Sequence, residues 1–240
     1  MLYITGDVHG GIHRRIEDLL TDVPYSWVEE NALIVCGDFG LPFVGDKKEL
    51  RHIQQVNDLC IQNNFNIYYV CGNHENFSIL YEYSIDADGY RVIASNIKHL
   101  QRGYLYKILG YDLFAFGGAM STDFGWHFQE EIASDDECQR GTETIKIAEN
   151  IDIIITHAAP MKILQYYNEK LVSYINPKRL QDPMAYLFEV YRKEIDKKFP
   201  HARWFNGHYH FSTIIPPTEG LCNISHISLY RDFYCIKNKK

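Results

Sequence analysis

The sequence predicts an α/β fold, and two patterns along the chain lead to this prediction. In the first third, an apolar run is followed three times by a polar loop that contains glycine and then by a helical pattern. This alternation is typical of a parallel sheet with crossover helices, whose ligand-binding loops follow the carboxyl ends of the strands. In the middle of the chain, short aromatic segments follow one another closely, which is typical of antiparallel strands.

The first third contains three expected strands and two expected helices. Apolar residues at three- and four-residue spacing predict a short helix around Ile12–Leu20 and a longer one from about Lys47 to Gln62. The expected strands are the apolar runs Leu2–Thr5, Ala32–Cys36 and Asn66–Cys71, and each of them stops at a loop with glycine.

The rest of the chain adds closely spaced strands, which predict an antiparallel meander in the middle, and two long helices. The expected strands are Ile97–Leu100, Tyr104–Leu109, Tyr111–Phe116, Ile151–Thr156, Arg203–Phe205 and two or three more up to Ile236. The expected helices are Asp135–Glu149 and Asp182–Lys197, and Asp182 is the expected N-cap of the second. Because no internal repeat or linker interrupts the chain, we expect residues 1–240 to form a single domain.

Composition and charge exclude several classes of protein. Hydrophobic residues make up 46% of the 240 residues and charged residues 23%, which argues against intrinsic disorder. The net charge of −7 disfavours long nucleic acid as a partner. The longest apolar runs are far shorter than the roughly 18 to 20 residues of a membrane span, and no leader pattern opens the chain. Six cysteines occur without a C-x-x-C pair, so we expect a reduced, cytoplasmic protein with no membrane partner.

Nearly all polar residues of interest lie in five loops, each directly after an expected strand. Together these loops offer two aspartates, one asparagine and five histidines, which are Asp7, His9, Asp38, Asn73, His74, His157, His208 and His210. Carboxylate, amide oxygen and imidazole are ligands suited to Mn²⁺, Fe or Zn²⁺, and no thiolate competes with them. The loops therefore predict a metal centre.

The spacing of these residues also indicates how they converge. Residues two apart in a strand face the same side, so Asp7 with His9, and His208 with His210, can each reach one site if the backbone is locally extended. Glycine beside each ligand allows the backbone to turn sharply. The two carboxylate oxygens of Asp38 can bridge two cations.

The ordered blocks D-x-H, G-D, G-N-H-E, H and G-H-x-H resemble the pattern of the calcineurin-like metallophosphoesterase superfamily. They occur here as Asp7/His9, Gly37-Asp38, Gly72–Glu75, His157 and Gly207–His210. The resemblance implies a four-layer α/β/β/α sandwich of two mixed sheets flanked by helices. It also implies a binuclear centre of two divalent metal ions, for which we expect Mn²⁺, with Fe or Zn²⁺ as alternatives.

The resemblance further implies a role for each loop residue. One metal ion would be held by Asp7, His9, Asp38 and His210, and the second by Asp38, Asn73, His157 and His208. Hydroxide bound to the metal ions would attack phosphorus in line, and His74 would protonate the leaving oxygen. The implied activity is therefore that of a metal-dependent phosphoric ester hydrolase that forms no covalent intermediate.

The chain departs from the protein Ser/Thr phosphatases of this superfamily at three positions. Those enzymes have Asp and Arg where this chain has Leu41 and Pro42, and a further Arg where it has Cys71. The departures weaken the protein-phosphatase interpretation and leave the substrate contacts to other side chains. The candidates are Arg14 and Arg15 as phosphate-binding cations and Asp123 as a partner of His74 in the substrate site.

Three functions stay open. A phosphomonoesterase is favoured, acting on a phosphorylated small molecule, a nucleotide or a phosphoprotein. A phosphodiesterase or nuclease is the alternative, and a nuclease would need a basic groove near His9 and His157. A non-catalytic interaction scaffold is disfavoured because the residue expected from the family pattern is present at every ligand position. Taken singly, Asp7 and Asp38 suit ordinary turns and His157 suits a buried core position, so the metal site rests on their ordered combination.

Overall fold

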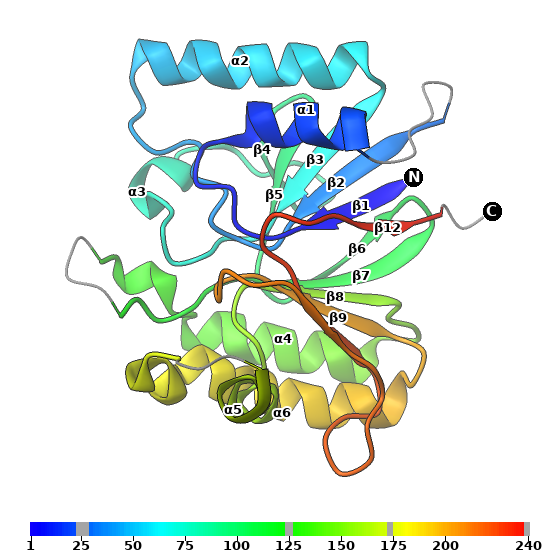
Figure 1. Cartoon of the computed structure of the whole chain (residues 1–240). Coiled ribbons are helices and arrows are strands. Elements are labelled where there is room, and N and C mark those ends of the chain that lie inside the picture. Colours follow the sequence, from blue (N-terminus) through cyan, green and yellow to red (C-terminus); the bar gives the residue numbers. More distant parts are fainter. Residues whose placement is uncertain (23–28, 123–126, 172–174, 238–240) are drawn as a thin grey trace.

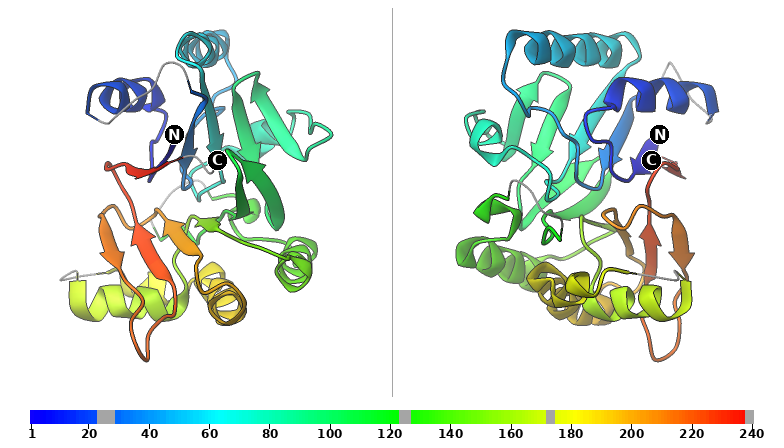
Figure 2. Two further views of the ribbon diagram at one scale, coloured as in Figure 1. Left: turned by 90° about the vertical axis from the view of Figure 1, so that its right-hand side faces the viewer. Right: turned by 60° about the vertical axis from the view of Figure 1, so that its left-hand side comes forward.

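Two six-stranded sheets lie face to face, and helices cover their outer faces (Figure 1). The computed structural model describes residues 1–22, 29–122, 127–171 and 175–237. Both sheets contain parallel and antiparallel neighbours, and the same layers are seen from two further directions in Figure 2. The α/β/β/α sandwich implied by the resemblance is therefore confirmed.

The first sheet contains the parallel strands predicted for the first third of the chain. Its order is β12 (Tyr234–Ile236), β1 (Leu2–Thr5), β2 (Asn31–Val35), β3 (Phe65–Tyr69), β5 (Ile97–Leu100) and β4 (Tyr90–Ala94). The four central strands are parallel, and the edge strands β12 and β4 run antiparallel to their neighbours. Helices α1 (Ile12–Asp22) and α2 (Lys47–Gln62) cover its outer face.

The second sheet has the same plan. Its order is β10 (Thr213–Ile215), β11 (Ser225–Ser228), β9 (Arg203–Asn206), β8 (Ile153–Thr156), β7 (Tyr111–Phe116) and β6 (Tyr104–Ile108). Its outer face is covered by α4 (Asp135–Ile147), α5 (Met161–Tyr166) and α6 (Pro183–Lys198). The remaining short elements are α3 (Phe77–Leu80), the 3₁₀ turns Gln129–Glu131 and Pro177–Gln181, and the π-helical turn Tyr167–Leu171.

Alternating side chains of the strands fill separate apolar cores. In β1, Tyr3 packs under α1 and α2, whereas Ile4 faces the second sheet. In β8, Ile154 packs against α4 and α6, whereas Ile155 faces the first sheet. Both faces of each sheet are therefore apolar, which explains why the central strands are continuous hydrophobic runs in the sequence.

The predicted antiparallel meander is correct only in part. Tyr104–Ile108 and Tyr111–Phe116 pair antiparallel, but Ile97–Leu100 belongs to the other sheet. Between β5 and β6, Gly103 adopts a φ of 82° and turns the chain away from the first sheet. The guanidinium of Arg102 is buried there and donates to the carbonyl of Gly117, at the end of β7. The short spacing between β5 and β6 would suit a hairpin, but these contacts direct β6 to pair with β7 in the second sheet.

The predicted long helices are confirmed. The helix over residues 47–62 has the expected bounds, and Asp182 caps α6 by accepting a hydrogen bond of 2.8 Å from the backbone N–H of Met184. None of the described helices is long and apolar enough to cross a membrane. All six cysteines are free thiols.

Because two histidines are buried without hydrogen-bond partners among the described residues, we expect the free energy of unfolding to fall in acid. His99 in β5 and His226 in β11 have no hydrogen-bond partner among the described residues, and burial lowers the pKa of each to about 3. In an unfolded chain, histidine titrates near pH 6.5. Between about pH 6.5 and 3 the unfolded chain therefore binds more protons, and the free energy of unfolding falls by about 1.4 kcal/mol per pH unit for each histidine.

Urea unfolding at pH 7 and pH 5 measures this loss. His226→Phe keeps a ring against Trp204, whose ring centroid lies 5.5 Å away, and should make the loss smaller. His52→Phe, at a half-buried position, is the control and should leave it unchanged. An equal loss in His226→Phe and the parent protein would contradict the prediction.

Candidate metal centre

The polar loops of both sheets meet at one end of the sandwich. Asp7, Asp38 and Asn73 with His74 follow β1, β2 and β3 of the first sheet, and His157 and His208 with His210 follow β8 and β9 of the second. Ligand atoms of Asp7, His9 and His210 lie within 4.8 Å of one another, and so do those of Asp7, Asp38 and His157. The structure thus brings together side chains that are about 200 residues apart in the sequence.

The loops converge through left-handed turns. The φ angles are 50° at His9, 50° at Asp38, 70° at His208 and 55° at His210. The backbone is therefore not locally extended at His9, His208 and His210, and Asp7 and His9 come together through a turn instead. A residue with a Cβ atom loses about 1 kcal/mol or more in this region, and such residues persist where the surroundings fix them, most often at functional sites.

Glycine is required beside the ligands for a second reason, because ligand side chains of neighbouring loops lie directly against its backbone. A Cβ atom on Gly37 would overlap the imidazole of His157, and one on Gly72 would overlap the carboxylate of Asp38. The ligand side chains therefore pack directly on the backbone of the adjacent loop. Any larger residue at these two positions would displace a predicted ligand.

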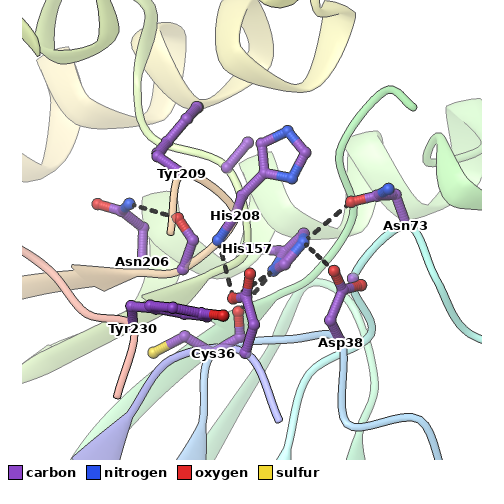
Figure 3. Close-up of polar contacts among 12 residues, drawn as sticks. Cys36, Asp38, Asn73, His157, Asn206, His208, Tyr209 and Tyr230 are labelled. Atoms are coloured by element: carbon purple, nitrogen blue, oxygen red, sulfur yellow. Dashed lines mark hydrogen bonds and ion pairs between the residues drawn. The ribbon is translucent and has the colours of Figure 1, made fainter. Parts of the chain in front are cut away.

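His157 is buried and joins the loops of the two sheets. Its Nδ1 lies 2.7 Å from the carbonyl oxygen of Cys36, and because a carbonyl can only accept, Nδ1 carries the proton. Its Nε2 lies 3.1 Å from Oδ1 of Asn73 and 3.4 Å from Oδ2 of Asp38 (Figure 3). Burial lowers the pKa of His157, but Asp38 and then Asp7 more than offset this and raise it to about 10. The oxygens around Nε2 therefore favour a positive charge at this point.

Asp38 belongs to the second group of ligand atoms and also lies near His9 of the first group. Burial alone would raise its pKa, but the charge and hydrogen bond of His157 lower the pKa of Asp38 well below its usual value. Its Oδ1 accepts from the backbone N–H of His74 at 2.9 Å, and its Oδ2 lies 3.9 Å from Nε2 of His9. An ionised carboxylate in this place suits a ligand shared by two cations.

Two other buried polar atoms of the site have no hydrogen-bond partner among the described residues, and this indicates whether a cation would fit there. Oδ2 of Asp7 lies 3.0 Å from Nε2 of His210, yet it accepts no hydrogen bond among the described residues. Nε2 of His208 is likewise buried without one. The ring of Tyr230 stacks on His210 and limits where that imidazole can turn. Unsatisfied buried atoms cost free energy, so a divalent cation with oxygen and nitrogen ligands fits this arrangement.

Asn73 is positioned by two residues that sequence analysis did not identify. Its Nδ2 donates to Oγ of Ser121 at 3.0 Å, and the Ser121 hydroxyl donates to Oε2 of Glu131 at 2.6 Å. This chain of hydrogen bonds fixes the amide so that its Oδ1 faces His157. The glycine-rich segment before Ser121 was the available signal, because it follows a strand as the other loops do.

Glu75, the last residue of the G-N-H-E block, holds two of the loops together. Its carboxylate accepts from the backbone N–H groups of Phe39 at 2.8 Å and Gly72 at 2.6 Å. Burial raises the pKa of Glu75 to about 8. Its contacts are with backbone, which indicates that it supports the loops after β2 and β3.

A pocket of about 200 Å³ opens over the site. Its described lining residues are Asp38, Asn73, His74, Thr122, Arg179, His208 and His210. Arg179, in the 3₁₀ turn Pro177–Gln181, is a cation that sequence analysis missed because its turn follows no strand. Its Nη1 donates to the carbonyl of His208 at 3.1 Å, and its buried Nε has no hydrogen-bond partner among the described residues.

Neither of the two arginines predicted to contact the substrate is among the described residues that line this pocket. Arg14 is exposed. Arg15 donates to Oγ1 of Thr5 and to the carbonyls of Tyr230 and Asp7, so its guanidinium orders the backbone behind the first loop. Asp123 lies outside the described residues.

Comparison with known families agrees with this geometry. The family model of calcineurin-like phosphoesterases matches residues 2–212. The chain belongs to this family. As a member, this phosphoesterase is a metal-dependent phosphoric ester hydrolase.

Among solved structures, this phosphoesterase is similar to a phosphopantetheinyl hydrolase from Mycobacterium tuberculosis. The two share 12% sequence identity with a TM-score of 0.46, and the match covers 95% of this chain and 89% of that one. No curated protein sequence matches the chain.

Removing the hydroxyl of Ser121 tests how Asn73 is held. In Ser121→Ala the Asn73 amide is free to rotate, so Mn²⁺ affinity at one site should fall about 10–100-fold. Calorimetric titration with Mn²⁺ measures this, and Ser95→Ala, an exposed serine away from the site, is the control. Equal Mn²⁺ affinities in Ser121→Ala and the parent protein would contradict the role given to Ser121.

Proposed function

We propose that this phosphoesterase hydrolyses phosphomonoesters of small molecules with two divalent metal ions, of which Mn²⁺ is favoured. The observation that carries the proposal is the pocket of about 200 Å³, in which His74 and Arg179 stand beside the predicted metal ligands. A pocket of this size has room for one phosphoryl group. Besides the proposed metal ligands, its described lining offers the substrate the guanidinium of Arg179 and the imidazole of His74.

The proposed ligand sets are those expected from the sequence. Asp7, His9, Asp38 and His210 hold one ion, and Asp38, Asn73, His157 and His208 hold the other. Bound metal ions supply Lewis acidity and lower the pKa of coordinated water. The mixture of carboxylate, amide and imidazole donors supports Mn²⁺, with Fe or Zn²⁺ as alternatives.

Two side chains act on the substrate in this proposal. The imidazole of His74 is exposed, its backbone N–H is fixed by Asp38, and its ring lies 5.7 Å from that of His9. It holds the proton that the leaving oxygen takes. The guanidinium of Arg179, with Nε unpaired among the described residues, binds the oxygens of the phosphoryl group.

Several observations support a small substrate over nucleic acid. Arg179 is the only Lys or Arg among the described residues that line this pocket or an adjoining groove, whose described lining is His9, Gly40, Phe43, Val44, Glu49 and His74. A nuclease would need a basic groove there, and the net charge of the chain is −7.

The free thiols support a reducing compartment such as the cytoplasm.

Turnover of matched p-nitrophenyl esters tests the proposal. Chelator-treated protein should regain activity with added Mn²⁺ and should hydrolyse the monoester faster than the bis-p-nitrophenyl diester. Asp38→Asn and His74→Ala should each lose at least about 100-fold in kcat. Faster hydrolysis of the diester would favour a phosphodiesterase. No hydrolysis of either ester, by protein that also binds no metal, would overturn the enzymatic proposal.

Arg179→Ala should weaken phosphate binding. Hydrogen bonds to charged groups contribute about 1.5–3 kcal/mol, so kcat/KM for the monoester should fall about 10–100-fold, mainly through KM. Arg179→Lys should recover part of the loss, and Arg140→Ala, at a half-buried arginine away from the pocket, should have no effect. Unchanged KM in Arg179→Ala would remove this residue from the substrate site.

A further inference from the structure

A second groove, of about 620 Å³, adjoins the metal pocket. Its described lining residues are His9, Gly40, Phe43, Val44, Glu49 and His74. His74 lines both cavities, so the groove begins where the pocket ends. A substrate whose phosphoryl group lies in the pocket therefore has this space on the side of His74.

The groove presents apolar side chains to solvent. Phe43 is 42% exposed and Val44 is 64% exposed, and Val44 also lines an adjoining hollow with Leu50 and Ile79. Single exposed apolar residues are common on protein surfaces. Here they line a groove beside the exposed imidazole of His74, and hollows with an apolar lining and a few polar groups are typical of small-molecule sites.

The loop that carries these side chains is held in place by a nearly buried carboxylate. Glu49, 9% exposed, accepts from the backbone N–H groups of Phe43, Val44 and Gly45 at distances of 2.6 to 3.0 Å. The side chain of Asn76 donates to the carbonyl of Phe43 at 2.7 Å. The apolar surface is therefore already formed before any ligand binds, so little loop entropy is lost on binding.

The charges of the groove select against an anionic occupant. None of the described lining residues is Lys or Arg, and the carboxylate of Glu49 is used by the loop backbone. A second phosphate or a carboxylate against Phe43 and Val44 would lose bound water without gaining a Lys or Arg partner, whereas burying an apolar group there is favourable.

We propose that this groove binds the leaving group of the substrate, and that this group is an uncharged, apolar alcohol. The inference rests on the function proposed above. The phosphoryl group lies toward Arg179, the organic group lies against Phe43 and Val44, and the ester oxygen lies near His74. Hydrolysis breaks the bond between phosphorus and this oxygen. Water supplies the oxygen that phosphorus gains, and the alcohol leaves with the proton that it takes at His74.

A series of alkyl phosphates tests the groove without changing the basicity of the leaving alcohol. With Mn²⁺ bound, kcat/KM should rise at least about tenfold from ethyl to n-hexyl phosphate, since each buried methylene contributes about 0.8 kcal/mol. Phe43→Ser and Val44→Ser should bring the ratio of the two values toward one, and Phe43→Leu should keep most of it. Val190→Ser, at a 58% exposed valine on α6, is the matched control and should leave the ratio unchanged.

Calorimetric binding of ethylphosphonate and n-hexylphosphonate gives a second measurement that needs no turnover. The longer ligand should bind at least about tenfold more tightly, and Phe43→Ser should remove the difference. Equal binding and equal kcat/KM for the two chain lengths would overturn the role given to the groove. If both phosphates were still hydrolysed with Mn²⁺, the proposed function would be unaffected. Tighter binding of n-hexylphosphonate by protein that hydrolyses neither ester would support the groove and contradict the proposed function.

Discussion

The imidazole of His157 extends from the end of β8 in the second sheet and donates from Nδ1 to the carbonyl of Cys36, at the end of β2 in the first sheet. This buried contact depends on Gly37, since any Cβ atom there would occupy the place of the ring. It also fixes the tautomer, so the remaining ring nitrogen faces the oxygens of Asn73 and Asp38. This hydrogen bond thus joins the loops of the two sheets at the metal centre and sets the direction in which His157 presents Nε2.

The rest of the centre is held against its own backbone preferences. His9, Asp38, His208 and His210 adopt positive φ, a conformation that costs free energy for residues with a Cβ atom. Buried contacts compensate locally: the carboxylate of Asp7 accepts from the backbone N–H of His208, and Asp38 does the same for His74. The proposed metal ligands therefore also fix the loops that carry them, which makes the site rigid before any ion binds.

Local signals were enough to predict which loops come together at the candidate metal centre, and much of the fold. Asp7, Asp38 and His157 each follow an apolar run, and this pattern places them at strand ends without knowledge of any distant contact. By contrast, the separation of β5 from β6 into two sheets depends on buried contacts of Arg102 with the end of β7. Arg179, Ser121 and Glu49 likewise have roles that follow only from which loops become neighbours, and no spacing in the sequence records that.

The origin of the ligands in both sheets has a consequence for the lifetime of the protein. Asp7 comes from the first sheet and His210 from the second, and their ligand atoms belong to one group. A cation bound to that group joins the layers, and because the unfolded chain has no such group, its binding free energy adds to the stability of the native state. Copies of the protein in a metal-starved cell would open more often and meet proteases sooner. Metal supply would then set how much of the protein persists as well as how fast each copy works.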